Sequence, residues 1–527
     1  MSANKLNLSP LPDLGDVIFI LLLQLLLFNV PNFVFGDGST GWHLVTGNYI
    51  LQTHSVPHQD ILSYTFPGKA WVAYEWLSDA IMAGIDRLAG LNGVAVFCSS
   101  LIALTFLLVY ERCRWVGCHF GFVVPIVVLG AIASSVHWLA RPHLFTFLGI
   151  YIFAVTLESF HRGTISEKRM LLTLVPCMLL WVNLHPGFVL GFVLLFIYLF
   201  SETAGALCYP PGTERLGYRN RRKWLSICLA ATLAASLITP YGVQLYGYIG
   251  RYLMGNRVLA ATDEYASPVF HGALQPVCLE LLFALLIISL VTSKARPSLP
   301  HLLSCLAFGL LALSSQRSIP FFVIVASPLI AYLLGQSELL PKVEEEEKKA
   351  EKTRWLTRWL KSWSSLGQSY DLMEYRCKMH LVPMAAVGVL FIVAINGGNM
   401  FGSRVLASSF DQKSKPSLTL DYIRDHKLSP ERGFNYDNWG GYIRYRLGIP
   451  VFIDDRADFY GQGFYLDYGR VSTVAPGWLD LLKQYKIEWV LFPRDSALAA
   501  RLMEQPDWQK VCEDPAAYLF VKHGSSG

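Results

Sequence analysis

The sequence predicts an α-helical polytopic membrane protein of about eleven transmembrane helices, followed by a small C-terminal α/β domain. Apolar stretches of bilayer-spanning length recur through residues 16–398, and a helix needs about 20 such residues to cross the hydrocarbon core. Only 16% of the residues are charged and the mean hydropathy is +0.38, whereas soluble domains are closer to a quarter charged. Residues 399–527 lose the apolar pattern and mix helical with strand-like periods.

The apolar stretches follow one another closely, and segment 170–184 is the shortest of them. We expect spans at residues 16–35, 91–110, 120–140, 143–160, 170–184, 187–203, 224–241, 276–292, 299–315, 319–335 and 379–398. No small-residue cleavage site follows the first span, which therefore indicates an anchor and not a removed signal peptide.

The charges of the connecting loops predict the orientation. One set of loops carries 22 Lys and Arg, while the opposite short loops carry six. The basic set comprises residues 1–15, 111–119, 161–169, 204–223, 293–298 and 336–378. Because basic loops stay in the cytoplasm, we expect a cytoplasmic N-terminus and, after an odd number of spans, an external C-terminal domain.

The net charge of +5 is small and lies on the predicted cytoplasmic loops, which favours lipid contact and excludes a nucleic-acid-binding surface. The ten cysteines are scattered, and Cys512 is the only one after residue 398, so an internal disulfide in that domain is excluded. Cys113, Cys118 and His119 supply too few ligands for a structural metal site.

Two segments interrupt the series of spans. Residues 36–90 form a long first external loop, in which 42–52 and 73–88 have the pattern of amphipathic helices that lie on a membrane. Residues 336–378 contain the charge run 344–349 and predict a cytoplasmic linker.

The C-terminal domain, residues 399–527, alternates short strands with helices. Strands are expected at 433–436, 450–453, 487–491 and 517–521. Helices are expected at 416–427, 438–447, 476–485 and 495–503.

Ionisable residues gather at the predicted external ends of the spans, where such residues are costly and often functional. They are Asp37, His43, Asp60, Glu75, Arg141, His143, His185, Asp263, Glu264 and Arg317. Asp454, Asp455, Arg456 and Asp458 follow an expected strand and form either an internal salt-bridge cluster or a substrate-contacting patch. Simpler interpretations remain open: Asp37 as a helix cap, Arg317 as an interfacial anchor and Glu75 on a solvated helix face.

This set of residues is typical of glycosyl transfer from a lipid-phosphate sugar. A carboxylate takes the proton of the attacking hydroxyl, and cations stabilise the departing phosphate. We expect Asp37 to be the base, with Glu75 and Asp60 as further carboxylates. Arg317, Arg141, His143 and His185 would bind the phosphate. We also expect Asp37, Glu75, Arg141, His143, His185 and Arg317 to line one cavity.

Several sequence runs strengthen this interpretation. They cover residues 36–47, 56–60, 63–68, 74–78, 140–144, 183–187, 316–320 and 451–460. They resemble a group of bacterial multi-pass proteins that are similar to GT-C glycosyltransferases, such as protein O-mannosyltransferases and lipid A aminoarabinose transferases. The resemblance implies an acid in the first external loop, which Asp37 matches. Well-known members often have a second acid beside it, where this chain has Gly38, so Glu75 or Asp60 is expected to replace it.

The resemblance further implies an inverting enzyme of the bacterial inner membrane. Its donor would be a polyprenyl-phosphate-linked sugar, and its acceptor an extracytoplasmic glycan, lipid or protein. The sequence identifies no cofactor and leaves a divalent metal open.

Two other functions remain: a transporter or lipid flippase, and a non-catalytic scaffold. Against transport, the ionisable residues gather at one face, whereas transporters place their sites near the midplane between repeated halves. Gly38 in place of a second acid keeps the scaffold open.

Overall fold

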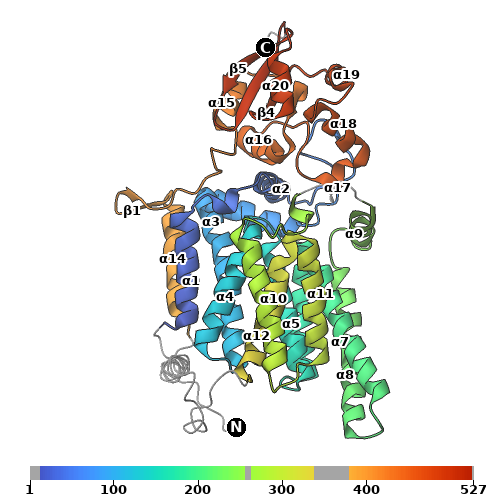
Figure 1. Cartoon of the computed structure of the whole chain (residues 1–527). Coiled ribbons are helices and arrows are strands. Elements are labelled where there is room, and N and C mark those ends of the chain that lie inside the picture. The colour runs from blue at the N-terminus through green and yellow to red at the C-terminus, as the bar shows by residue number, and fades with distance from the viewer. Residues whose placement is uncertain (1–11, 256–262, 338–378, 525–527) are drawn as a thin grey trace.

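A computed structural model describes residues 12–255, 263–337 and 379–524 of the chain. It consists of a helix bundle with a small α/β domain standing on one end (Figure 1). The predicted cytoplasmic linker, residues 336–378, lies almost wholly outside the described residues.

Every predicted span coincides with a bundle helix. These helices are α1 (Leu14–Gln24, continued by a π-helical turn Leu25–Asn29), α3 (Trp76–Trp115), α4 (Phe120–Ser134), α5 (Leu144–His161), α6 (Glu167–Leu184), α7 (Val189–Cys208), α8 (Thr213–Ser236), α10 (Leu274–Thr292), α11 (Leu299–Ser314), α12 (Ile319–Gly335) and α14 (Leu381–Ile395). Among the described residues, six helical segments are long and apolar enough to cross a membrane, and three more apolar helices are shorter. The protein is therefore membrane-embedded, while the number of eleven crossings stays a prediction.

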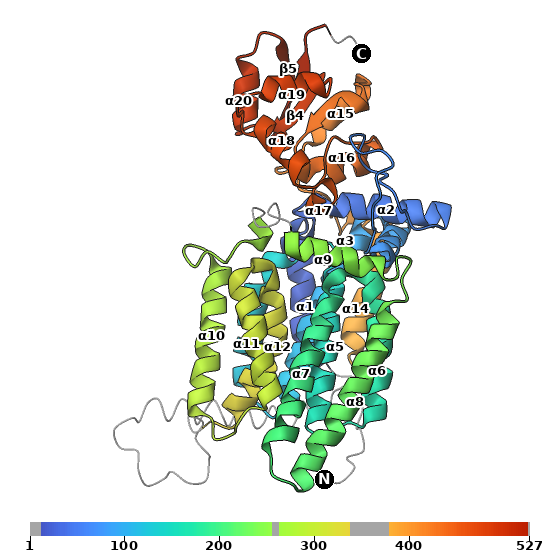
Figure 2. The ribbon, with the colours of Figure 1, turned by 90° about the vertical axis from the view of Figure 1, so that its right-hand side faces the viewer.

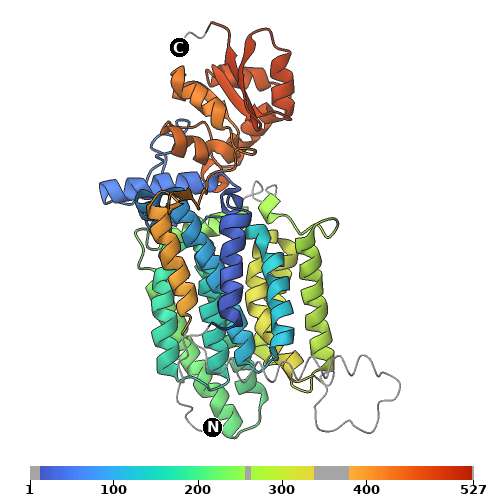
Figure 3. The same cartoon turned by 90° about the vertical axis from the view of Figure 1, so that its left-hand side faces the viewer.

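The bundle is built around α12, of which 89% of the apolar window is buried, compared with 33% for α10 at the edge. Helix α12 packs against α4, α10 and α11. At another edge, α1 and α14 lie side by side (Figure 3). Since α1 starts and α14 ends the series of spans, the two ends of the membrane-embedded part meet there.

The first loop contains helices at both places where the sequence predicts them. Helix α2 (Ser39–Thr53) and the first part of α3 lie across the end of the bundle (Figure 2). At Gly90 the backbone of α3 adopts φ 60°, which glycine tolerates, and the helix turns there into the bundle. Trp42, Leu44 and Ile50 are buried because α2 packs against α3 and against α16 of the C-terminal domain.

The C-terminal domain contains a four-stranded sheet of order β3-β4-β6-β5. Strand β3 (Gly433–Asn435) runs parallel to β4 (Trp489–Pro493), and β4 and β5 (Trp508–Glu513) run antiparallel to β6 (Ala517–Lys522). The surrounding helices are α15 (Ser417–Asp425), α16 (Gly440–Leu447), α17 (Ala457–Tyr460), α18 (Gln462–Ser472), α19 (Trp478–Gln484) and α20 (Ala497–Met503). A short hairpin, β1 (Asn399–Met400) and β2 (Ser403–Arg404), joins the domain to α14.

The predicted strand at 450–453 is wrong. Val451 forms only an isolated parallel bridge with Ser63 of the first loop, so this segment fastens the two parts of the molecule and does not enter the sheet. Strand β5 and helices α17 and α18 were not predicted.

The C-terminal domain rests on α2 at backbone contact distance. A Cβ atom placed on Gly41 would lie 2.3 Å from the carbonyl oxygen of Gly441, and one on Gly441 would lie 2.4 Å from that of Gly38. Only glycine permits such an approach, and it brings the loops of the domain onto the end of the bundle.

Candidate active site between the bundle and the C-terminal domain

A cavity of about 500 Å³ opens between the end of the bundle and the C-terminal domain. The six residues expected to share a cavity, Asp37, Glu75, Arg141, His143, His185 and Arg317, all line it. Five other candidates also line it. His43 and Glu264 come from the bundle side, and Asp455, Arg456 and Asp458 come from the C-terminal domain. The structure thus brings together residues that are up to 421 positions apart, from Asp37 to Asp458.

Arg141 stands at the centre of the acidic residues. Its Nε lies 2.6 Å from Asp37 Oδ2, outside hydrogen-bonding angles, and its Nη1 donates to Glu264 Oε1 at 2.6 Å. Its Nη2 lies 3.3 Å from Asp455 Oδ2. Burial opposes the charge of the guanidinium, but the three carboxylates raise the pKa of Arg141 above its usual value. Arg141 is therefore a permanent cation held in place from three sides.

Asp455 connects the two parts of the molecule. Its carboxylate accepts hydrogen bonds from Ser39 Oγ and, at 2.8 Å, from Trp42 Nε1, both on α2. Burial raises the pKa of both Asp37 and Asp455, although the positive charge of Arg141 opposes the shift. Protons are therefore held more tightly in this cluster than by carboxylates in water.

Glu75 is the most isolated acid of the cavity. The residue is 8% exposed, and its nearest basic atoms are His185 Nε2 at 3.4 Å and His43 Nδ1 at 3.8 Å. Burial raises the pKa of Glu75 to about 8, because neither Arg141 nor Arg317 lies close enough to offset the loss of hydration.

The three histidines are neutral at physiological pH, because burial lowers the pKa of His143 to about 3 and that of His43 and His185 well below the usual value. His185 Nδ1 accepts hydrogen bonds from Thr146 Oγ1 and Gly187 N–H, so its proton is on Nε2, facing Glu75. His143 donates from Nε2 to the carbonyl of His137. Neutral His143 and His185 add no positive charge to the cavity, and their expected role in phosphate binding stays a prediction.

Arg317 is the cation of the cavity with the fewest partners. Its guanidinium stacks 4.6 Å from the ring centre of Tyr265 and donates to that phenol oxygen. Among the described residues, no carboxylate lies within ion-pair distance of Arg317. Its charge is therefore available to an anionic ligand.

Asp60 does not line the cavity, contrary to its expected role as a catalytic carboxylate. Its oxygens accept from the backbone of Leu62 and Ser63, from Ser63 Oγ and, at 2.8 Å, from Arg456 Nη2. Arg456 also pairs with Asp454 and stacks on Trp71. These residues form the internal salt-bridge cluster that was one of the two interpretations of this segment. The side chain of Asp263 lies outside the described part of the structure.

Several lining residues were not predicted, among them Tyr74, Tyr265, Asp437, Tyr465 and Tyr468. Four of these five are aromatic, and the sequence offers no sign that distinguishes them from core residues. Asp437 follows β3, and burial raises its pKa to about 6. Lys415 is almost fully buried nearby and donates to Asn438 Oδ1 at 3.1 Å.

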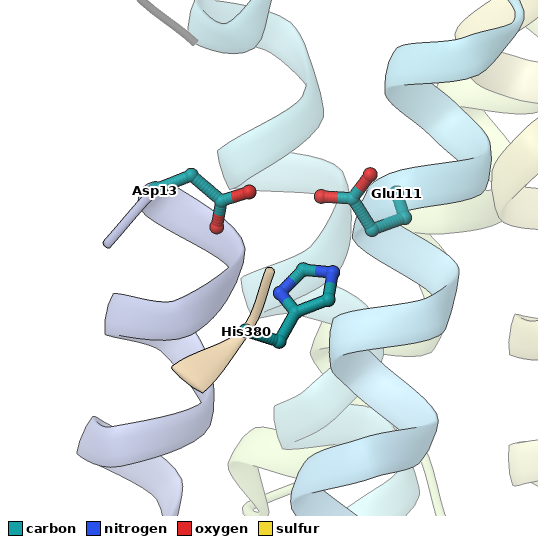
Figure 4. Close-up of side chains that lie close together, drawn as sticks. All are labelled: Asp13, Glu111 and His380. Carbon is teal, nitrogen blue, oxygen red and sulfur yellow. The ribbon is translucent and has the colours of Figure 1, made fainter. Parts of the chain in front are cut away.

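The carboxylates of the cavity surround a guanidinium and do not form a compact set of metal ligands. In the described part of the chain, one group of three ligand atoms lies close enough together for a metal: Asp13, Glu111 and His380 (Figure 4). It lies at the opposite end of the bundle, where α1 and α14 begin. The divalent metal left open by the sequence thus gains no support at the cavity.

No protein-family model and no curated protein matches the sequence. Solved structures do resemble the fold. The archaeal oligosaccharyltransferase AglB of Archaeoglobus fulgidus, in complex with an inhibitory peptide and a dolichol-phosphate, superposes with a TM-score of 0.58 and 12% identity, over 91% of this chain and 69% of that one. Its apo form gives a TM-score of 0.55.

ArnT of Cupriavidus metallidurans in the apo state covers 96% of this chain and 97% of its own, with 13% identity and a TM-score of 0.49. The oligosaccharyltransferase is a GT-C glycosyltransferase. The match to AglB covers 91% of this chain and so includes both the helix bundle and the C-terminal domain. The chain therefore has the fold of the GT-C glycosyltransferases.

Proposed function

We propose that the protein is an integral membrane glycosyltransferase that moves a sugar from a polyprenyl-phosphate donor to an extracytoplasmic acceptor, with inversion. The observation that carries this proposal is the composition of the cavity. It places Arg317, an arginine without an acidic partner among the described residues, near carboxylates that hold protons tightly, at the end of a membrane bundle. The AglB structure that holds dolichol-phosphate supports a lipid-linked donor for the same fold.

The proposed roles follow from the charges of the residues. Arg317 binds the donor phosphate, because its guanidinium is bidentate and not already neutralised. Arg141, which three acids hold, is fixed in position and adds positive charge to the departing phosphate. Asp37 takes the proton of the acceptor hydroxyl as it attacks the anomeric carbon, the bond to the phosphate oxygen breaks, and the phosphate leaves with the electron pair. Glu75 is the alternative base.

The decisive experiment measures transfer of labelled sugar from a polyprenyl-phosphate donor in reconstituted membranes. Asp37→Asn keeps the shape and removes the charge, so we expect intact protein and transfer reduced by roughly 100-fold or more. Arg317→Lys keeps the charge but loses the planar fork, so donor use should weaken. Asp425→Asn, an exposed change on the same C-terminal domain, is the matched control.

Full activity in Asp37→Asn would exclude it as the base and leave Glu75. Failure to transfer from any lipid-phosphate sugar, combined with movement of substrate across vesicle membranes, would favour a transporter or flippase. The position of the cavity at one end of the bundle speaks against transport, since a transporter alternates access around a central site.

A further inference from the structure

The cavity contains more carboxylates than its arginines neutralise. Six carboxylates line it: Asp37, Glu75, Glu264, Asp437, Asp455 and Asp458. Three arginines face them, Arg141, Arg317 and Arg456. Arg141 is occupied by three of the acids, and Arg456 is paired with Asp454 and Asp60 outside the cavity. Glu75, Asp437 and Asp458 are thus left without a lysine or arginine partner among the described residues.

The contacts of these three acids are neutral. Asp458 accepts from the phenol of Tyr248, and Asp437 accepts from the backbone N–H of Asn438 at 2.9 Å and faces Tyr468 Oη at 3.4 Å. Glu75 is more than nine-tenths buried, and the described structure gives it no hydrogen bond, only the two neutral histidines nearby. A buried carboxylate without a cation is costly even where neutral groups donate to it, so such a group awaits either a proton or a cationic ligand.

Aromatic rings surround the same acids. Glu75 and Asp458 border a second, smaller pocket beside the main cavity, which Trp42, Tyr74 and Trp71 also line, together with Arg456, whose guanidinium stacks on Trp71. Tyr465 and Tyr468 line the main cavity near Asp437. Carboxylates spaced among aromatic faces suit an ammonium group, which gains from both the charges and the ring quadrupoles. A divalent metal needs ligand atoms close to one another, which these acids do not provide.

We propose that Glu75 and Asp458, together with the aromatic rings around them, bind a protonated primary amine carried by the acceptor. The inference rests on the proposed glycosyl transfer. It assigns the amine to the acceptor because Asp458 and Asp437 belong to the C-terminal domain, which stands above the bundle (Figure 2). Arg317, the donor-phosphate candidate, comes instead from the bundle at the start of α12, where a lipid-linked molecule arrives from the membrane. The cavity thus separates an anionic substrate from a cationic one.

The test is a binding experiment on the full chain in lipid nanodiscs, without donor. Two probes share one skeleton: the glucosamine disaccharide, which has free amines, and its di-N-acetyl form, which has none. At neutral pH, where a bound ammonium group favours the ionised form of Glu75, we expect the amine form to bind at least roughly tenfold more tightly, with a preference that falls as salt is added. In Asp458→Asn and in Glu75→Gln the preference should shrink several-fold towards equality, while Asp458→Glu should restore it. Asp425→Asn should keep it in full.

Equal binding of the two sugars by the unchanged protein would overturn the inference. So would a preference that a metal chelator abolishes, because the acids would then hold a divalent ion. The readout separates this inference from the proposed function. Amine preference without sugar transfer would reject the transfer reaction alone, and transfer without amine preference would reject only the assignment of the acceptor.

Discussion

At the scale of single residues, the buried acids of the cavity set the pH behaviour of the protein. Burial raises the pKa of Glu75 to about 8 from an ordinary value of 4.5. The folded state therefore keeps a proton on Glu75 at pH values where the unfolded chain has lost it. The free energy of unfolding that this residue contributes is complete below about pH 4.5, decreases as the pH rises through this window and levels off above about 8.

We expect the melting temperature of the unchanged protein to fall more steeply between about pH 5 and 8 than that of Glu75→Gln, which imitates the protonated acid. A single such proton changes the free energy of unfolding by up to about 1.4 kcal/mol per pH unit. Thermal unfolding of both proteins in the same detergent at several pH values measures the difference. Parallel curves for the two proteins would show that Glu75 keeps an ordinary pKa.

A second prediction concerns the residues that share Arg141. Asp37 and Asp455 come from different parts of the chain but contact the same guanidinium, so removal of either charge alters what the other contributes. We expect Asp37→Asn and Asp455→Asn to be non-additive in unfolding free energy by about 0.5–3 kcal/mol. The measurement is a double-mutant cycle by denaturant or thermal unfolding. Asp467→Asn, an exposed acid of α18 paired with Arg470, replaces Asp455→Asn in the control cycle and should add independently.

At the scale of elements, the contact between α2 and α16 depends on glycines. A Cβ on Gly41 would collide with the backbone of Gly441, which cannot move aside as a flexible side chain does. We expect Gly41→Ala to destabilise the docked C-terminal domain by about 1–3 kcal/mol and to open the junction to proteases. Gly463→Ala is the matched control, because its Cβ would meet open space on α18. Limited proteolysis of both variants measures the difference. Equal resistance to the protease would show that the contact between α2 and α16 adjusts to the added Cβ.

The predictions from the sequence succeeded for elements that depend on the local sequence and failed for those that depend on tertiary contacts. Long apolar helices were predicted at every position where the structure has them, because span length and hydropathy depend on the local sequence alone. The strand expected at 450–453 failed since Val451 pairs with Ser63 of the first loop, a tertiary contact that no local pattern encodes. Strand β5 was missed because its sequence, Trp508–Glu513, is polar and lies at the sheet edge.

The residues of the site that lie at the ends of spans could be predicted from the sequence. The six residues expected to share a cavity do share one, because the loops that carry them all lie at one end of the bundle. The roles of these residues stay predictions. Asp437 and the tyrosines of α18 were missed, since they enter the cavity only through the docking of α16 on α2. Gly38, Gly41 and Gly441 mark that docking in the sequence, but a glycine shows its purpose only when the segment that it faces is known.

At the scale of the whole molecule, orientation remains to be tested. The loop between α5 and α6 lies at the end of the bundle away from the C-terminal domain, and it belongs to the basic set of loops. We therefore expect reporter fusions that end after Gly163 to report the cytoplasm and those that end after Phe410 to report the outside. The reverse pattern would place the cavity on the cytoplasmic face, away from any extracytoplasmic acceptor.

The order of strands in the C-terminal sheet determines when the cavity can form during synthesis of the protein. Strand β3, which leads directly to Asp437, is held by β4, and β4 is held on its other side by β6, which ends at Lys522. One wall of the cavity therefore assembles only after β6 has been made. A ribosome-bound chain that still lacks β6 can insert its helices into the bilayer, yet it has no finished cavity for the proposed transfer. The fold thus ties the completion of the cavity to the synthesis of β6.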